Sequence, residues 1–164
     1  MKIKNSIALF LILMVVWILV NNSFSGQIII IGLILSAIIT LLFGANLRIF
    51  DELKFTPASL GYTLIYLFVF LIELIKSNLD VARRVLTPSL PINPGIVKTK
   101  TILKSKMGRM ILANSITLTP GTLTVDIKDD TLYIHWIDVC CEDIDKATNA
   151  IVKKFEKHLV KIYG

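Results

Sequence analysis

Residues 60–84 read LGYTLIYLFVFLIELIKSNLDVARR, and this stretch decides how the rest of the chain is arranged. It starts as an uninterrupted apolar segment, acquires Glu73, Lys76 and Asp80 about a helical turn apart, and ends in two arginines. A bilayer span needs about 20 apolar residues, and the uninterrupted apolar core here covers only residues 64–72. This length favours an interfacial, re-entrant or protein-buried helix over a span.

Two plainer apolar runs precede this stretch, at residues 7–20 and 28–43. The uncharged segment NNSFSGQ joins them and contains no small-residue cleavage site, so a signal peptide is disfavoured. With 164 residues, 54% hydrophobic composition and a mean hydropathy of +0.72, the chain is too apolar for an ordinary soluble domain. We expect residues 1–58 to form a transmembrane helical hairpin.

The basic residues of the loops predict the orientation of this hairpin. Lys2 and Lys4 precede the first run, and Arg48 and Lys54 follow the second. Basic residues concentrate on the cytoplasmic side, so the N-terminus and the loop at 44–58 are placed inside. A third span would then carry the C-terminal domain outside. We favour two spans and a helix at residues 59–86 lying at the cytoplasmic boundary, and three spans remain the alternative.

The remainder reads as a water-soluble α+β domain at residues 96–164, after a proline-rich linker at 87–95. Alternating polarity predicts strands at 96–103, 123–128 and 131–137. Helical periodicity predicts helices at 105–116 and 142–162. The expected fold class is a membrane protein whose hairpin is followed by a small cytoplasmic domain of β-α-β-β-α order.

The pattern also predicts which side chains share a face. Leu123, Val125 and Ile127 should share one face of their strand. In the first helix of the domain, the positions at helical spacing are Met107, Met110, Ile111 and Asn114, with Asn114 the polar exception. In the last helix, the expected apolar stripe is Ile144, Ala147, Ile151, Phe155, Leu159 and Ile162.

Between residues 80 and 109 the charge is strongly positive, with seven basic residues against Asp80 alone. A basic block directly after a membrane segment favours contact with anionic lipid headgroups or an acidic protein. Nucleic acid is the weaker alternative, because aromatic residues are not interleaved with these charges. The candidate contact residues are Arg83, Arg84, Lys98, Lys100, Lys104, Lys106 and Arg109.

Glu73 has two interpretations. An ionisable group at membrane depth is a candidate functional group, here one that borders an ion path. Alternatively, Glu73 belongs to a solvated polar stripe where the helix leaves the membrane, paired with Lys76 and Asp80 on one helical face.

The sequence contains no pattern that indicates an enzyme. Cys140 and Cys141 are adjacent and have no histidine or cysteine at metal-ligand spacing, and His135 is expected to be a surface side chain. A nucleophile–base pair and a phosphate-binding loop are also not found. We therefore expect no catalytic residues, no cofactor and no metal.

The segment ANSITLTPGTLTVDI, residues 113–127, contains a turn signature at Thr119, Pro120, Gly121 and Thr122. Proline followed by glycine is typical of a type II turn. Together with LIELIKSNLDVARRV, PGIV and LYIHWID, this segment resembles the E subunit of the Mrp/Mnh-type multisubunit Na⁺/H⁺ antiporter. The resemblance covers residues 65–138.

The resemblance implies a cell-membrane component of a complex that exchanges cytoplasmic Na⁺ for external H⁺. In that family the large subunits carry the ion-translocating machinery, so the resemblance implies an accessory role in assembly or coupling. Its partners would be the other antiporter subunits and membrane lipids. The alternative is a stand-alone membrane-anchored module that binds anionic lipid or an acidic partner.

Overall fold

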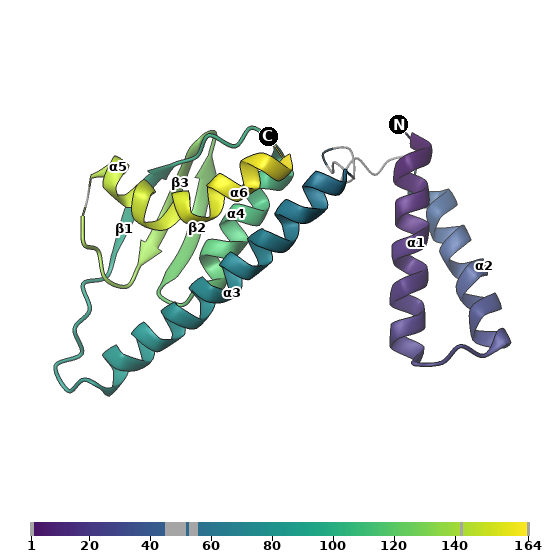
Figure 1. The fold of residues 1–164 in the computed structure, drawn as a ribbon, viewed down its shortest axis with the longest axis horizontal. Coiled ribbons are helices and arrows are strands. Elements are labelled where there is room, and N and C mark those ends of the chain that lie inside the picture. The colour runs from purple at the N-terminus through teal and green to yellow at the C-terminus, as the bar shows by residue number, and fades with distance from the viewer. Residues whose placement is uncertain (1, 45–51, 53–55, 142, 164) are drawn as a thin grey trace. The chain divides into compact units, whose positions relative to one another are not determined.

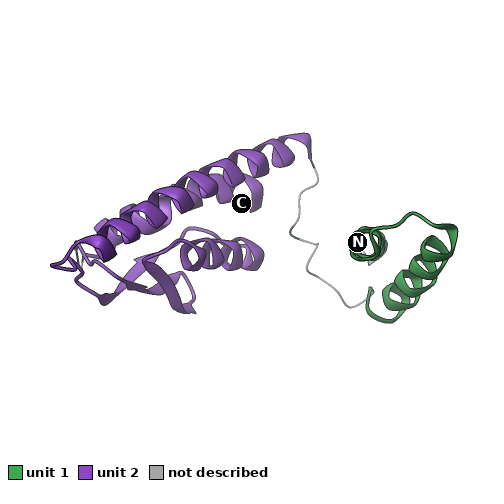
Figure 2. Cartoon of the chain, turned by 90° about the horizontal axis from the view of Figure 1, so that it is seen from below, with its two compact units in different colours: residues 1–53 green, residues 54–164 purple. Residues whose placement is uncertain are grey.

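The computed structural model describes residues 2–44, 52, 56–141 and 143–163 (Figure 1). The chain divides into two compact units, residues 1–53 and residues 54–164 (Figure 2). The first unit contains two apolar helices, and the second contains a long helix with a small sheet and further helices. This layout fits a membrane protein with two or three apolar helices before a small α+β domain. Arg48 and Lys54, which the predicted orientation uses, lie outside the described residues.

The first unit is a helical hairpin of α1 (Lys2–Asn21) and α2 (Gly26–Phe43). Ser25 starts α2 by accepting a hydrogen bond from the Ile28 N–H at 3.5 Å. Gly32 faces α1 so closely that an added Cβ would lie 2.4 Å from Trp17 Cδ1. The Trp17 indole donates to the Ile28 carbonyl at 2.9 Å. Small residues on the inner face thus allow the two helices to approach, as is common between helices in membranes.

Helix α3 (Pro57–Leu86) begins with Thr56, whose hydroxyl accepts from the Ser59 N–H at 3.1 Å. Pro57 stands at the first helical position, where its missing N–H costs nothing. By length and composition, α2 and α3 are long and apolar enough to cross a membrane, and α1 has a shorter apolar segment at residues 5–21. Composition alone therefore does not separate α3 from a span.

The sheet contains β1 (Gly95–Lys100), β2 (Thr122–Lys128) and β3 (Thr131–Trp136) in the order β1-β3-β2. Both pairings are antiparallel, and Val97 lies opposite Ile134. One face of the sheet packs on the helices, whereas the other face, which carries Lys98 and Lys100, is exposed.

The prediction that Leu123, Val125 and Ile127 share one face of β2 is wrong. A β-bulge between Thr124 and Asp126 shifts the register, so that Leu123 and Val125 lie on the exposed face, 48% and 56% accessible. Ile127, beyond the bulge, is partly buried against the core. An extra residue in one strand reverses the alternation, which a period-two pattern cannot reveal.

The predicted stripe of α4 (Lys106–Leu118) is partly wrong, although Ile111 packs against the core and Met107 is half-buried. Met110 and Asn114 are exposed, and Gly108, Leu112 and Ile116 are buried. Gly108 packs against the Tyr163 side chain, where an added Cβ would lie 3.2 Å from Tyr163 Cβ. The buried face of α4 therefore combines a small residue, Gly108, with the large Leu112 and Ile116, and a stripe counted from large apolar side chains alone omits Gly108.

The C-terminal helical region consists of α5 (Ile144–Ala147), a π-helical turn (Thr148–Val152) and α6 (Lys153–Tyr163). Asp143 starts it by accepting from the Lys146 N–H at 2.9 Å. Most of the predicted stripe is buried, with Phe155 and Leu159 fully inaccessible, but Ile144 is 38% accessible. The fully buried side chains of the domain include Phe155, Leu103, Leu112, Ile116, Leu132, Ile134, Leu159 and Val152.

Candidate functional site

The site is the contact between α3 and the rest of the second unit, where the most distinctive sequence segments meet. Tyr66 of α3 forms a hydrogen bond with the Ser115 hydroxyl of α4. The centroids of the Phe70 and Phe155 rings are 6.4 Å apart, and Lys161 Nζ lies 4.8 Å from the centre of the Tyr62 ring. One face of α3 is therefore a domain face, which packs mainly on α6 along the helix (Figure 1).

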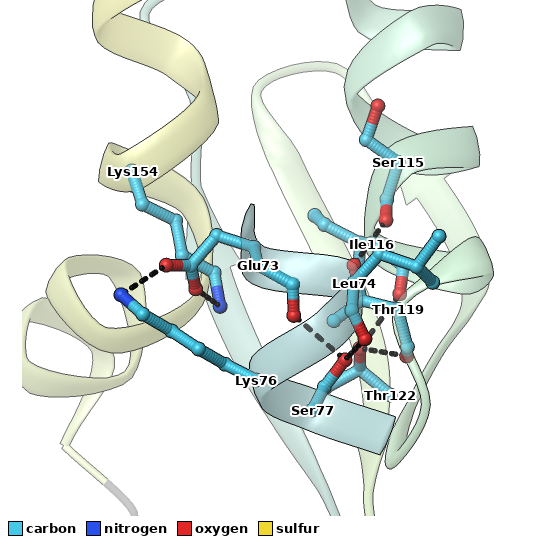
Figure 3. A network of polar contacts seen from close by, with 9 residues as sticks. All are labelled: Glu73, Leu74, Lys76, Ser77, Ser115, Ile116, Thr119, Thr122 and Lys154. Carbon is cyan, nitrogen blue, oxygen red and sulfur yellow. Dashed lines mark hydrogen bonds and ion pairs between the residues drawn. The ribbon is translucent and has the colours of Figure 1, made fainter. Parts of the chain in front are cut away.

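Glu73 belongs to this domain face (Figure 3). Its Oε2 lies 3.0 Å from Lys154 Nζ on α6, and its Oε1 lies 3.3 Å from Lys76 Nζ. The side chain is 21% accessible. The carboxylate thus lies between two ammonium groups, one of them on α6.

Arg84 joins the end of α3 to the linker and to the sheet. Its guanidinium donates to the carboxylates of Asp80 and Asp138, each at 2.7 Å, and to the Pro91 carbonyl at 2.7 Å. A guanidinium that donates to two carboxylates holds them in fixed geometry. Asp138 was not among the predicted site residues, because nothing in the sequence connects it with Arg84.

The turn at residues 119–122 has type II geometry. Gly121 has φ +90°, and the Thr122 N–H donates to the Thr119 carbonyl at 3.2 Å. The Thr122 hydroxyl donates to the Ile116 carbonyl at 2.6 Å, and this carbonyl also accepts from the Thr119 N–H at 3.2 Å, so both bonds close the end of α4. An added Cβ at Gly121 would lie 3.0 Å from Ile137 Cγ2, so the turn also packs tightly on the end of β3.

A cavity of about 240 Å³ lies between α3, this turn, the end of β3 and the start of α6. Its lining includes Ser77, Arg84, Gly121, Asp138 and Lys154. The structure therefore brings the turn at residues 119–122 and Asp138 together with Arg84 and the other polar residues of α3, although these two regions are far apart in sequence.

The basic block of residues 80–109 does not form one patch. Arg109 acts inside the domain, because it donates to the Leu103 carbonyl at 2.7 Å and to the Asp129 carbonyl. Arg84 is likewise paired, with Asp80, Asp138 and the Pro91 carbonyl. The exposed members lie at three separate places, on α3 (Arg83), on the outer face of the sheet (Lys98 and Lys100) and around the start of α4 (Lys104 and Lys106).

Glu156 is a buried hydrogen-bond acceptor that the sequence pattern does not reveal. It is 5% accessible, and its Oε1 accepts from the Thr101 hydroxyl and from the Ile102 N–H, the latter at 2.8 Å. A carboxylate on a mostly basic helix reads as a surface residue, so the only signal would have been its position between Phe155 and Leu159.

The cysteine thiols contact each other, with Cys140 Sγ 3.3 Å from Cys141 Sγ. The pKa of Cys141 is raised above its usual value, mainly because of this contact with Cys140, and the thiol therefore stays protonated. Within the described residues, no group of three or more histidine, cysteine, aspartate or glutamate side chains could hold a metal ion. The side chains of this site therefore serve to pack and position α3 on the rest of the second unit.

Comparisons with known proteins agree on one family. The family profile MNHE, described as a Na⁺/H⁺ ion antiporter subunit, matches residues 10–162. The chain is 34% identical to the Na⁺/H⁺ antiporter E subunit of Alkalihalophilus pseudofirmus, over 95% of this chain and 96% of that protein. It is 38% identical to the Na⁺/H⁺ antiporter E subunit of Bacillus subtilis, over 89% and 90%.

A solved structure is also similar. One chain of the membrane-bound sulfane sulfur reductase, an archaeal respiratory membrane complex, is 42% identical to this chain. The match covers 94% of this chain and 96% of that chain, with a TM-score of 0.83. Both units of the fold therefore occur together in a chain of a large membrane assembly.

Proposed function

Because the chain belongs to the MNHE family of Na⁺/H⁺ ion antiporter subunits, we propose that it is an accessory subunit of a multisubunit monovalent-cation/proton antiporter. Its role is assembly or coupling within a complex that exchanges cytoplasmic Na⁺ for external H⁺. The match of the family profile to residues 10–162, across both units, carries this proposal. The two bacterial relatives are named as antiporter subunits, not as enzymes.

In this proposal residues 1–58 form a two-span anchor, residues 59–86 form a helix at the cytoplasmic boundary, and residues 87–95 link it to the cytoplasmic domain at 96–164. The packing of α3 supports the boundary position. From Tyr62 to Arg84 the helix contacts the water-soluble domain. A spanning α3 would carry α6 and its lysines into the hydrocarbon, where each charge costs several kcal/mol.

Glu73 is proposed to hold α3 on α6, because both of its carboxylate oxygens are paired with lysines. The alternative proposal is that it borders an ion path. Assay of Na⁺-dependent proton exchange in everted vesicles that carry Glu73→Gln distinguishes them. Lost exchange in a fully assembled complex would support the ion path, and unchanged exchange would support the holding role.

The exposed basic residues Lys98, Lys100, Lys104 and Lys106 are proposed as contacts to partner subunits. Lys98 and Lys100 share the outer sheet face with apolar side chains that are open to a partner, including Ile96, Leu123 and Val125. Protein interfaces combine an apolar core with a polar rim, and this exposed face offers both kinds of side chain.

A second candidate function is favoured by the 42% identity to a chain of the sulfane sulfur reductase complex. The chain would then serve as the corresponding subunit of a respiratory membrane complex. In both cases its partners are other subunits of a membrane assembly, so the stand-alone module is disfavoured.

The experiment is purification of the tagged full-length chain from its native membrane in mild detergent. We expect a large assembly whose other subunits co-purify and, in proteoliposomes, exchange Na⁺ for H⁺. An assembly that reduces sulfane sulfur would support the second candidate. Recovery of the chain alone, together with unchanged cation exchange in membranes that lack it, would contradict both.

A further inference from the structure

The face of α3 opposite its domain face is apolar and uncovered in the second unit. Leu64, Phe68, Leu71, Ile75 and Leu79 recur at helical spacing on it and are 51–70% accessible. They span about 22 Å of helix at about 1.5 Å per residue. An uncovered apolar strip of this length predicts an apolar environment in the functioning protein.

Two lysines of α6 contact α3. Lys161 reaches over the Tyr62 ring, and Lys154 meets Glu73. Lys153 and Lys157 precede Lys161 at intervals of four residues on the same helix, and all three are exposed. We call Lys153, Lys157 and Lys161 the α6 stripe.

Helix α3 adds positive charge of its own. Lys76 is 68% accessible and pairs with Glu73, which in turn pairs with α6. Arg83 lies seven residues further, on the same side of the helix, and is exposed. An apolar face with a lysine-rich flank is the usual arrangement of helices that lie in the surface of an anionic membrane.

We propose that the α6 stripe binds anionic lipid headgroups while the apolar face of α3 lies in the acyl boundary of the same leaflet. The inference rests on the proposed boundary position of α3 and assigns its lipid-binding charges to α6. Packed helices lie about 8–10 Å apart, and the headgroup zone is several Å thick, so lysines on α6 reach it.

This assignment differs from the one that the charge pattern suggests. Lys98 and Lys100 lie on the outer face of the sheet, which points away from the helices. They therefore cannot contact the membrane surface that α3 occupies. Of the basic block at residues 80–109, the proposed lipid contact therefore uses Arg83 and not the lysines of the sheet.

The test uses the full-length chain in nanodiscs, with Cys140→Ser, Cys141→Ser and a single cysteine introduced by Phe68→Cys. Nanodiscs contain phosphatidylcholine with or without phosphatidylglycerol. The first measurement is the reaction rate of this cysteine with a water-soluble maleimide. The second is energy transfer from a donor on this cysteine to acceptor-labelled phosphatidylglycerol or phosphatidylcholine, which gives the local enrichment of the anionic lipid.

We expect slow maleimide labelling and an enrichment of phosphatidylglycerol of about fivefold or more, since one lysine near an anionic surface is worth about 1 kcal/mol. Replacing the α6 stripe by glutamine should lower the enrichment severalfold, to what Lys76 and Arg83 of α3 supply. The matched control replaces Lys98, Lys104 and Lys106 by glutamine, which removes the same charge from exposed positions elsewhere, and should leave the enrichment unchanged. Trp136 emission should show that both variants are folded.

Slow labelling without enrichment, or equal loss in both triple variants, would overturn the α6 stripe and leave the boundary position of α3 intact. Fast labelling in every nanodisc would overturn the lipid contact itself. Protection of the cysteine only in the assembled complex would instead identify the apolar face as a protein interface. None of these results decides the antiporter proposal, which depends on co-purification and cation exchange.

Discussion

The α1–α2 hairpin and helix α3 are similarly apolar, yet they bury different side chains. The hairpin buries small and polar residues, including Asn5, Gly32 and Ser36, and exposes its large apolar side chains. Helix α3 packs aromatic rings and charged groups on the α+β domain and leaves its opposite face apolar. The two helical segments therefore differ more in what they bury than in their hydropathy.

Each unit has its own spectroscopic reporter, because the two tryptophans are Trp17 in the hairpin and Trp136 in the domain. Replacing either one by phenylalanine allows the other unit to be followed alone. Such single-tryptophan proteins test whether the two units behave as differently as their packing suggests.

The largest effect is expected for Glu156→Leu in the domain. The substitution leaves the Thr101 hydroxyl and the Ile102 N–H without their acceptor, at a cost of about 2–4 kcal/mol for two buried donors. Denaturant unfolding followed by Trp136 fluorescence measures this loss. Glu156→Gln keeps a carbonyl acceptor and should lose much less, and Trp17 emission should not change. Equal losses for both variants would contradict the acceptor role.

In the hairpin, Gly32→Leu should cost about 1–3 kcal/mol by overpacking. The new side chain would displace the Trp17 ring and break its hydrogen bond to the Ile28 carbonyl. A red shift of Trp17 emission and a lower detergent concentration at the unfolding midpoint would report this. The matched control is Gly26→Leu, where an added Cβ meets nothing within 4 Å. A similar shift in the control would show that the close approach at Gly32 is unimportant.

A smaller effect is expected where α3 meets α6. A double-mutant cycle of Glu73→Gln and Lys154→Gln should give a coupling of about 0.5–1 kcal/mol, because the pair is partly exposed. Unfolding followed by Trp136 provides the four free energies, and added salt should reduce the coupling. A coupling of zero would mean that the pair does not hold α3 on the domain.

The smallest effect concerns pH. His158 Nε2 is buried and has no hydrogen-bond partner among the described residues. Burial, followed by the charges of Lys157 and Lys161, lowers the pKa of His158. Below about pH 6.5, His158 therefore binds a proton more readily in the unfolded chain than in the folded chain. Because protonation favours the unfolded state, domain stability falls as pH decreases through that value. His158→Gln should flatten the Trp136-detected stability profile between about pH 7 and pH 5. An unchanged slope would assign the pH dependence to other groups.

The sequence predicts much of this fold because its local signals are strong. A helix is predicted to start at residue 105, and the Ser105 hydroxyl caps α4 by accepting from the Gly108 N–H at 3.0 Å. The Pro120–Gly121 signature predicts the turn, and the positive φ of Gly121 agrees. Alternation also predicts the strands at 96–103 and 131–137, whose Val97 and Leu132 are buried.

The errors arise where a contact between distant residues decides the outcome. Leu123 and Val125 lie outside because of a bulge, and Met110 lies outside because Gly108 and Ser115 pack inward. Arg84 and Arg109 resemble surface charges in the sequence, but their partners, Asp138 and backbone carbonyls, are remote in the chain. Glu156 is missed for the same reason. Pairings of this kind carry no periodic signal.

The π-helical turn at Thr148–Val152 gives the C-terminal helix a built-in change of phase. One residue more than a regular α-helical turn rotates everything that follows by about 100°. The turn also places the Thr148 hydroxyl where it accepts from the Lys100 N–H of the edge strand at 2.9 Å. The first half of the helix can therefore pack on the sheet, while the second half directs Lys154 and Lys161 toward α3. A chain shortened by one residue here would have to give up one of these two alignments.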